Sequence, residues 1–108
     1  IKHPAATFYG RVEGDSMIDA GISDGDIVVI DRALEPSHGD IVVAFVDGEF
    51  TIKYLDMAHK DEGYILLVPA NKNFQPIKIY NQDNFIIWGV VAWTIKRRIS
   101  NANAPELP

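Results

Sequence analysis

Short apolar runs separated by turn signals most constrain what this chain can fold into. The runs are rich in Val, Ile, Phe, Tyr and Trp, and no long stretch shows the 3.6-residue spacing of an amphipathic helix. Turn-forming dipeptides such as Asp24-Gly25 and Asp47-Gly48 lie between them. The pattern predicts a mostly β fold with little helix, apart from a short helical turn around Met17 to Ala20. The expected strands are 27–30, 41–46, 50–55, 64–68, 77–80 and 85–95.

Composition limits the classes of function that the chain can have. The 108 residues are 47% hydrophobic and contain no Cys, which indicates one globular domain and excludes disulfide and thiolate-metal sites. A net charge of -5 offers no basic footprint for a phosphate backbone, so we expect no direct nucleic-acid binding. No apolar run approaches the ~20 residues that span a bilayer, so a cytoplasmic domain without membrane contact is expected. The domain is expected over 1–100, with 101–108 as a disordered tail.

No metal or cofactor site is indicated by the sequence. The spacing of the acidic residues in the N-terminal third does not match a calcium loop, and there is no zinc-protease, phosphate-loop or dinucleotide-binding motif. These acidic residues are interpreted as turn formers: Asp15, Asp19, Asp24, Asp26 and Asp31.

One hairpin can be predicted residue by residue. Asp47-Gly48 between two apolar runs is typical of a two-residue type I′ turn, because glycine accepts the positive φ that this turn requires. That turn pairs Val42 with Lys53 and Ala44 with Thr51. Lys53 then shares a face with small and apolar side chains, an unusual setting for an ammonium group.

Lys53 and Ser16 are the candidate chemical groups. From the strand pattern alone, Lys53 is either a surface lysine that extends its charge to water or, if buried, a general base with a lowered pKa. Ser16, in the turn Gly14-Asp15-Ser16-Met17, either caps backbone groups or acts as a nucleophile near backbone amides. A histidine base finds little support, since the histidines fall at the terminus, in a turn and in a polar loop: His3, His38 and His59.

Three motifs favour the chemical interpretation. The sequence contains GDSMIDAGISDGDIVVID at 14–31, SHGDIVVAFVDGEFTIKYL at 37–55 and WGVV at 88–91. Together they closely resemble the LexA/UmuD family of self-cleaving serine peptidases, and its UmuD branch more than its LexA branch. The resemblance runs from about residue 3 to residue 98 and keeps the family's motif order.

The resemblance implies a serine/lysine dyad in a strongly bent, barrel-like β domain. Ser16 matches the family nucleophile and is followed by Met17 in the motif. Lys53 matches the general base, and Thr51 matches a position whose hydroxyl orients the lysine amine. The backbone amides of Asp15 and Ser16 are expected to form the oxyanion hole.

The resemblance also implies a biological role. Members of this family cleave their own N-terminal arm at a small-residue–glycine bond, promoted by a RecA filament on single-stranded DNA. In the UmuD branch the trimmed domain forms a homodimer that joins a UmuC-like translesion polymerase, in error-prone DNA polymerase V. The arm would lie ahead of Ile1, because Ala20-Gly21 follows the nucleophile and is interpreted as a turn. The alternative role is the C-terminal self-cleavage and dimerisation domain of a LexA-like transcriptional repressor.

Overall fold

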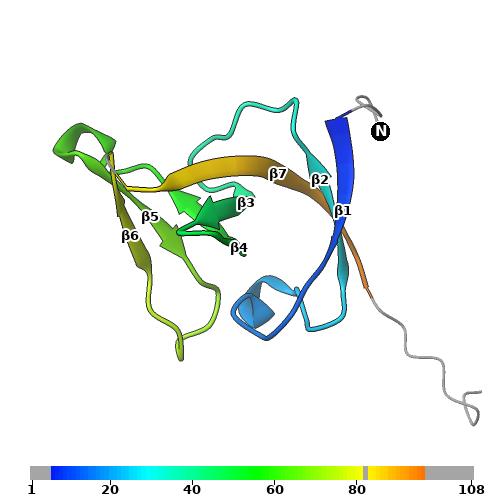
Figure 1. Cartoon of the computed structure of the whole chain (residues 1–108). Coiled ribbons are helices and arrows are strands. Elements are labelled where there is room, and N and C mark those ends of the chain that lie inside the picture. Colours follow the sequence, from blue (N-terminus) through cyan, green and yellow to red (C-terminus); the bar gives the residue numbers. More distant parts are fainter. Residues whose placement is uncertain (1–5, 82, 97–108) are drawn as a thin grey trace, which may run out of the picture.

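The chain folds into a single curled antiparallel sheet of seven strands (Figure 1). The computed structural model describes residues 6–81 and 83–96, so the predicted tail at 101–108 and His3 lie outside the described residues. The mostly β, strongly bent fold predicted from the sequence is confirmed. The strands are β1 (Thr7–Arg11), β2 (Ile27–Asp31), β3 (Ile41–Val46), β4 (Glu49–Asp56), β5 (Tyr64–Val68), β6 (Ile77–Tyr80) and β7 (Phe85–Ile95).

Helical structure in the described residues is limited to short 3-10 turns. The turn η2 (Ile18–Ala20) falls where the sequence predicted one, and η3 (Lys60–Glu62) was not predicted. None of the helices in the described ranges is long and apolar enough to cross a membrane.

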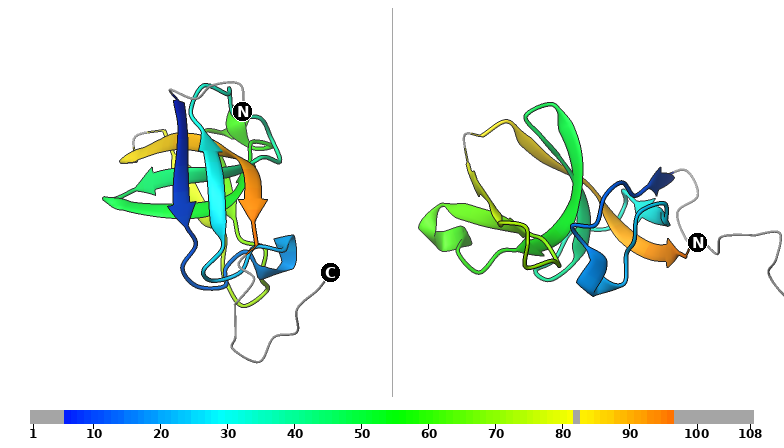
Figure 2. Two further views of the ribbon diagram at one scale, coloured as in Figure 1. Left: turned by 90° about the vertical axis from the view of Figure 1, so that its right-hand side faces the viewer. Right: turned by 90° about the horizontal axis from the view of Figure 1, so that it is seen from below.

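Strand β7 connects the two halves of the sheet. The strand order is β1-β2-β7-β3-β4-β5-β6, and β7 pairs with β3 through its first half and with β2 through its second half. The register shifts once in each pairing, which leaves Trp88 as an extra residue opposite β3 and Ala92 as an extra residue opposite β2. Such bulges bend and twist a strand. Figures 1 and 2 show β7 arching from the β5–β6 side of the molecule to the β1–β2 side.

Gly89, next to the first bulge, marks a close approach of β2 to β7. A Cβ atom at this position would lie 2.5 Å from Cγ2 of Ile30 and 3.4 Å from the carbonyl oxygen of Asp31. The first distance is far below van der Waals contact, and Cγ2 of a β-branched side chain has little freedom to move. The bent path of β7 therefore requires glycine here.

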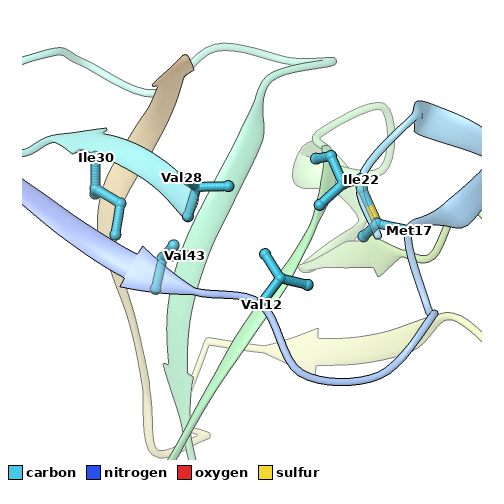
Figure 3. Close-up of a cluster of buried hydrophobic side chains, with 6 residues drawn as sticks. All are labelled: Val12, Met17, Ile22, Val28, Ile30 and Val43. Carbon is cyan, nitrogen blue, oxygen red and sulfur yellow. The ribbon is translucent and has the colours of Figure 1, made fainter. Parts of the chain in front are cut away.

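Strand β3 separates two clusters of buried side chains. Val43 belongs to one cluster with residues from the 12–22 segment and β2, whereas Val42 and Ala44 belong to the other. This division follows from the strand itself, because successive side chains point to opposite faces. Figure 3 shows the first cluster: Val12, Met17, Ile22, Val28, Ile30 and Val43. The second contains Val42, Ala44, Leu55, Leu67, Ile79 and Val90.

The predicted hairpin between β3 and β4 is confirmed in register. Val42 pairs with Lys53 and Ala44 with Thr51, and both turn residues have positive φ, 49° at Asp47 and 88° at Gly48. Val42 and Ala44 are fully buried and Lys53 is only 8% exposed. The lysine therefore lies beside the second core cluster, as the turn chemistry predicted.

The close approach at Gly89 gives a prediction about stability. We expect Gly89→Ala to lower the free energy of unfolding by about 1–3 kcal/mol, because the added methyl group overpacks β2 against β7. Gly10→Ala is the matched control, since its Cβ would meet Cδ1 of the same Ile30 at an ordinary 3.4 Å. Urea denaturation of the two variants measures the difference. Equal stability of both variants would contradict this account of the strand crossing.

Candidate active site

The hydroxyl groups of Ser16 and Thr51 both lie within hydrogen-bond distance of the Lys53 amine. Nζ of Lys53 lies 3.2 Å from Oγ of Ser16, 2.7 Å from Oγ1 of Thr51 and 3.0 Å from the carbonyl oxygen of Ile52. Thr51 reaches the amine because side chains two residues apart on β4 project from the same face. Ser16 reaches it from the segment between β1 and β2, on the other half of the sheet.

The surroundings of Lys53 favour its neutral form. Burial lowers the pKa of this lysine from its ordinary value of 10.5, because an ammonium group loses hydration inside the protein. The amine contacts three neutral oxygens. A neutral amine has two N–H groups, which match Thr51 and Ile52, and one lone pair, which is then left for the Ser16 hydroxyl. This arrangement suits a group that accepts a proton from serine.

The segment that carries Ser16 is fixed from the turn after β5. The amide of Ala70 donates to the carbonyl oxygen of Ser16 at 2.8 Å, and the amide of Asp19 donates to the carbonyl oxygen of Ala70 at 2.8 Å. The side-chain amide of Asn71 donates to the carbonyl oxygen of Asp15 at 2.9 Å. Met17 is 1% exposed in the first core cluster, so its side chain anchors the segment beside the nucleophile candidate.

Sequence reasoning missed Ala70 and Asn71. The Asn and Pro residues of the stretch 69–76 indicate only a turn or loop. The contact with Ser16 joins backbone groups of segments far apart in the chain, and such groups leave no residue-type signature. No signal in a single sequence identifies them.

A pocket of about 510 Å³ opens beside these groups. Ser16, Thr51 and Lys53 supply polar groups to its lining, as do Arg11 and Glu13. Side chains from β2, β3, β4 and β7 form an apolar wall: Val28, Ile30, Val43, Phe50, Ile52 and Trp88. Residues 9–13 border it on the β1 side. Within the described residues, β1 lacks a second strand partner, and β5 pairs with β4 only at 54–56. The pocket therefore has backbone edges on two sides that are open to an extended chain.

Backbone amides are also available beside the serine. Within residues 6–81 and 83–96, the amides of Asp15 and Ser16 donate no hydrogen bond to another protein group. Gly14, with φ 80°, turns the chain immediately before them. Two free donors next to a nucleophile suit the negative charge of an oxyanion.

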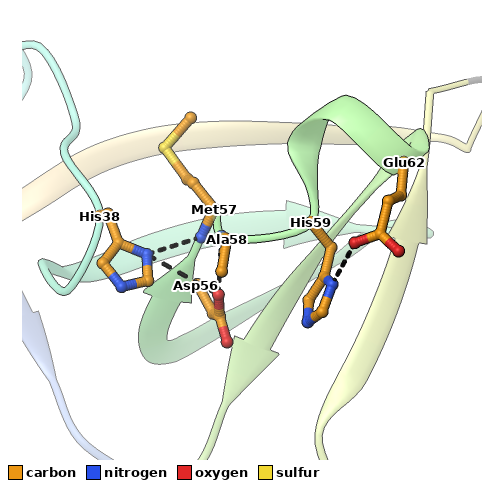
Figure 4. Close-up of polar contacts among 6 residues, drawn as sticks. All are labelled: His38, Asp56, Met57, Ala58, His59 and Glu62. Atoms are coloured by element: carbon orange, nitrogen blue, oxygen red, sulfur yellow. Dashed lines mark hydrogen bonds and ion pairs between the residues drawn. The ribbon is translucent and has the colours of Figure 1, made fainter.

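The described histidines lie away from this site, around the loop between β4 and β5 (Figure 4). Nδ1 of His38 accepts the amide of Met57 at 2.9 Å, and Nδ1 of His59 lies 2.5 Å from Oε2 of Glu62. Neither histidine lines the pocket. These side chains fix the loop and leave Lys53 as the basic group beside Ser16.

No metal centre is formed by the part of the chain that the structure describes. Among residues 6–81 and 83–96, no group of three or more His, Cys, Asp or Glu side chains is placed to hold a metal ion. Two of the acidic residues from Asp15 to Asp31 bind amides of their own turns: Oδ2 of Asp26 accepts the amide of Ser23, and Oδ1 of Asp31 accepts that of Ala33. Oδ1 of Asp24 instead accepts the amide of Gly14, in the segment that precedes Ser16.

Comparison with known proteins identifies relatives of the whole described domain. Residues 1–92 match the family described as Peptidase S24-like. The chain is 44% identical over 97 residues to the protein MucA of Salmonella typhimurium, covering 88% of this chain and 63% of MucA. It is 43% identical over 97 residues to ImpA of Shigella flexneri, covering 90% of this chain and 63% of ImpA. The LexA repressor of Clostridium perfringens is 47% identical over 77 residues, covering 71% of this chain and 36% of the repressor. The chain thus spans less than two thirds of the length of these relatives.

The lowered pKa of Lys53 gives a prediction about stability and pH. Between that lowered pKa and 10.5, the unfolded chain binds more protons at this site than the folded protein does. The folded state therefore gains stability as pH rises through this window. Measured by urea denaturation relative to Lys53→Met, which keeps the length but cannot titrate, wild-type stability should increase from about pH 7 towards about pH 10. A constant difference across this range would contradict the lowered pKa.

Proposed function

Because the chain belongs to the Peptidase S24-like family, as the resemblance of its motifs predicted, we propose that it is a serine peptidase that cleaves its own N-terminal arm. Ser16 is the nucleophile, Lys53 the general base and Thr51 the residue that orients the amine. The observation that carries this proposal is the 3.2 Å contact between Nζ of Lys53 and Oγ of Ser16, made by a lysine whose pKa burial lowers.

The reaction proceeds in two acyl-transfer steps. The neutral amine of Lys53 takes the hydroxyl proton of Ser16 as Oγ attacks the scissile carbonyl carbon. The tetrahedral intermediate collapses when the C–N bond breaks and Lys53 returns the proton to the leaving amine. The same amine then takes a proton from water, whose oxygen attacks the acyl-serine. The acyl C–O bond breaks, Lys53 returns the proton to Oγ of Ser16, and the new carboxylate is released.

Thr51 and Ile52 hold the amine in the orientation that this proton transfer needs. If the two N–H groups donate to Oγ1 of Thr51 and the carbonyl oxygen of Ile52, rotation about the last side-chain bond is restricted. The lone pair then stays directed at Ser16. The amides of Asp15 and Ser16 act as the oxyanion hole, and Met17 holds their segment in the core.

The pocket has the features that a peptide substrate requires. An extended chain fits beside the open backbone edges of β1 and of β4 at 49–53, in the manner of an added strand. The apolar wall accepts side chains next to the scissile bond. As the family resemblance implies, we expect the scissile bond to join a small residue to glycine.

The biological role that we propose is that of an SOS-response protein of the UmuD type. A RecA filament on single-stranded DNA promotes the cleavage, and the trimmed domain acts in the cytoplasm as a homodimer and accessory subunit of a UmuC-like translesion polymerase. The alignments with MucA and ImpA support this branch, because they cover 88% and 90% of the chain whereas the LexA repressor covers 71%. The alternative, the C-terminal domain of a LexA-like repressor, rests on the 47% identity to that repressor.

The proposal predicts self-cleavage by the longer protein that includes any segment encoded ahead of Ile1. Intact-mass spectrometry over time should show the loss of one defined N-terminal fragment. The rate should rise with pH from about 7 to about 10 and increase with RecA on single-stranded DNA, because deprotonation of Lys53 activates Ser16. Ser16→Ala and Lys53→Ala should each reduce the rate by more than about 10³-fold.

A serine-directed phosphonofluoridate probe tests the nucleophile in the 108-residue chain itself. One adduct should form on Ser16 and be absent from Ser16→Ala. Cleavage or labelling that persists without both side chains would refute the dyad.

The role of Thr51 gives a separate prediction. Thr51→Val keeps the shape of the side chain and removes its hydroxyl, so we expect self-cleavage or Ser16 labelling to slow by about 10-fold to 100-fold. Thr51→Ser restores the hydroxyl and should recover most of the rate. Equal rates for the Val and Ser variants would show that the hydroxyl does not orient Lys53.

A further inference from the structure

A second lysine, Lys96, contacts the turn that follows the Ser16 segment. Lys96 follows the end of β7, and its Nζ donates to Oδ2 of Asp26 at 2.6 Å, to the carbonyl oxygen of Gly21 at 2.8 Å and to Oγ of Ser23 at 3.3 Å. The three N–H groups of one ammonium group thus meet three oxygens of a single turn, residues 21–26.

In this ion pair the carboxylate is enclosed by the protein, whereas the Lys96 side chain is 39% exposed. The side chain of Asp26 is 2% exposed, and its Oδ2 also accepts the amide of Ser23 at 2.8 Å. A buried carboxylate requires charged or hydrogen-bonding partners, and loss of one partner leaves its charge poorly compensated. Lys96 is therefore one of the groups that hold this turn in place.

The 21–26 turn is joined directly to the segment that carries Ser16. The amide of Ile22 donates to the carbonyl oxygen of Met17 at 3.2 Å, and the amide of Gly14 donates to Oδ1 of Asp24 at 2.8 Å. Figure 3 shows the side chains of Met17 and Ile22 next to each other in the first core cluster. A displacement of the turn is thus transmitted to the residues on both sides of Ser16.

We propose that Lys96 is a positioning residue for Ser16, holding the 12–26 segment so that the serine hydroxyl stays within reach of Lys53. The inference rests on the proposed function, in which Ser16 is the nucleophile. Residues 12–26 contain no β-strand and are anchored from two sides. Ala70 and Asn71 hold the side near Asp15, and Lys96 holds the opposite side through Gly21 and Asp26.

The contact between Oγ of Ser16 and Nζ of Lys53 tolerates little displacement. The Ser16 hydroxyl is already 3.2 Å from the amine of Lys53, near the upper limit for a hydrogen bond. A shift of ~1 Å in the position of a reacting group costs roughly 10²-fold in rate. Loss of the Lys96 contacts leaves the segment held by Ala70, Asn71 and the buried Met17, and frees its Gly21–Asp26 side to shift.

The experiment compares Lys96→Met with Lys78→Met, which makes the same chemical change at a lysine of β6 that contacts the rings of Tyr64 and Tyr80. Two quantities are measured in the 108-residue chain: hydrogen exchange of the Ala70 and Asp19 amides, and the rate of phosphonofluoridate labelling of Ser16. We expect Lys96→Met to speed exchange and slow labelling, each by about tenfold or more, while Lys78→Met changes neither. Lys96→Arg can still pair with Asp26, so it should restore both the slow amide exchange and the labelling rate to near the wild-type values.

The outcomes separate this inference from the proposed function. Labelling and exchange within about twofold of wild type in Lys96→Met would overturn the inference. So would an equal loss in the Met and Arg variants, or a loss that simply follows a lowered global stability measured by urea denaturation. If the wild type itself is not labelled, the nucleophilic role of Ser16 fails, and the exchange at Ala70 still decides whether Lys96 holds the segment.

Discussion

The bend in β7 is the constraint on which the architecture depends. One strand pairs with β3 through its first half and with β2 through its second half, and the bulges at Trp88 and Ala92 turn it between them. Gly89 allows β2 to approach closely at the bend. Without this turn, the segment carrying Ser16 and the strand carrying Lys53 would belong to separate parts of a flat sheet. The curl places them on either side of one pocket.

Within that frame, the chemistry that we propose depends on keeping the amine of Lys53 away from water. Lys53 has neutral oxygens around it, and burial lowers its pKa. A carboxylate beside it would stabilise the ammonium form and work against proton acceptance. Lys96 presents the opposite arrangement, because its amine pairs directly with the carboxylate of Asp26. Two lysines near the same segment thus have different environments, one suited to chemistry and the other to structure.

Much of the fold and of the candidate site could be predicted from the sequence, because these features depend on interactions between residues close together in the chain. Turn chemistry at Asp47-Gly48 fixed the register of β3 and β4, and with it the face shared by Thr51 and Lys53. The strand β1 was missed, since Gly10 interrupts it and its aromatic residues Phe8 and Tyr9 are exposed. The anchors at Ala70, Asn71 and Lys96 could not be predicted for a different reason. Each joins segments distant in sequence, largely through backbone atoms, and only the folded topology brings those atoms together.

Because the site is divided between both halves of the sheet, it can form only after the whole domain has been synthesised and folded. A chain emerging from the ribosome has Ser16 long before Lys53 is synthesised, and in the unfolded state Lys53 keeps its ordinary pKa and is protonated. Neither half alone contains a nucleophile with an available base. In the reaction that we propose, the protein therefore becomes able to cleave itself only when it folds. An incomplete or misfolded copy has no activity.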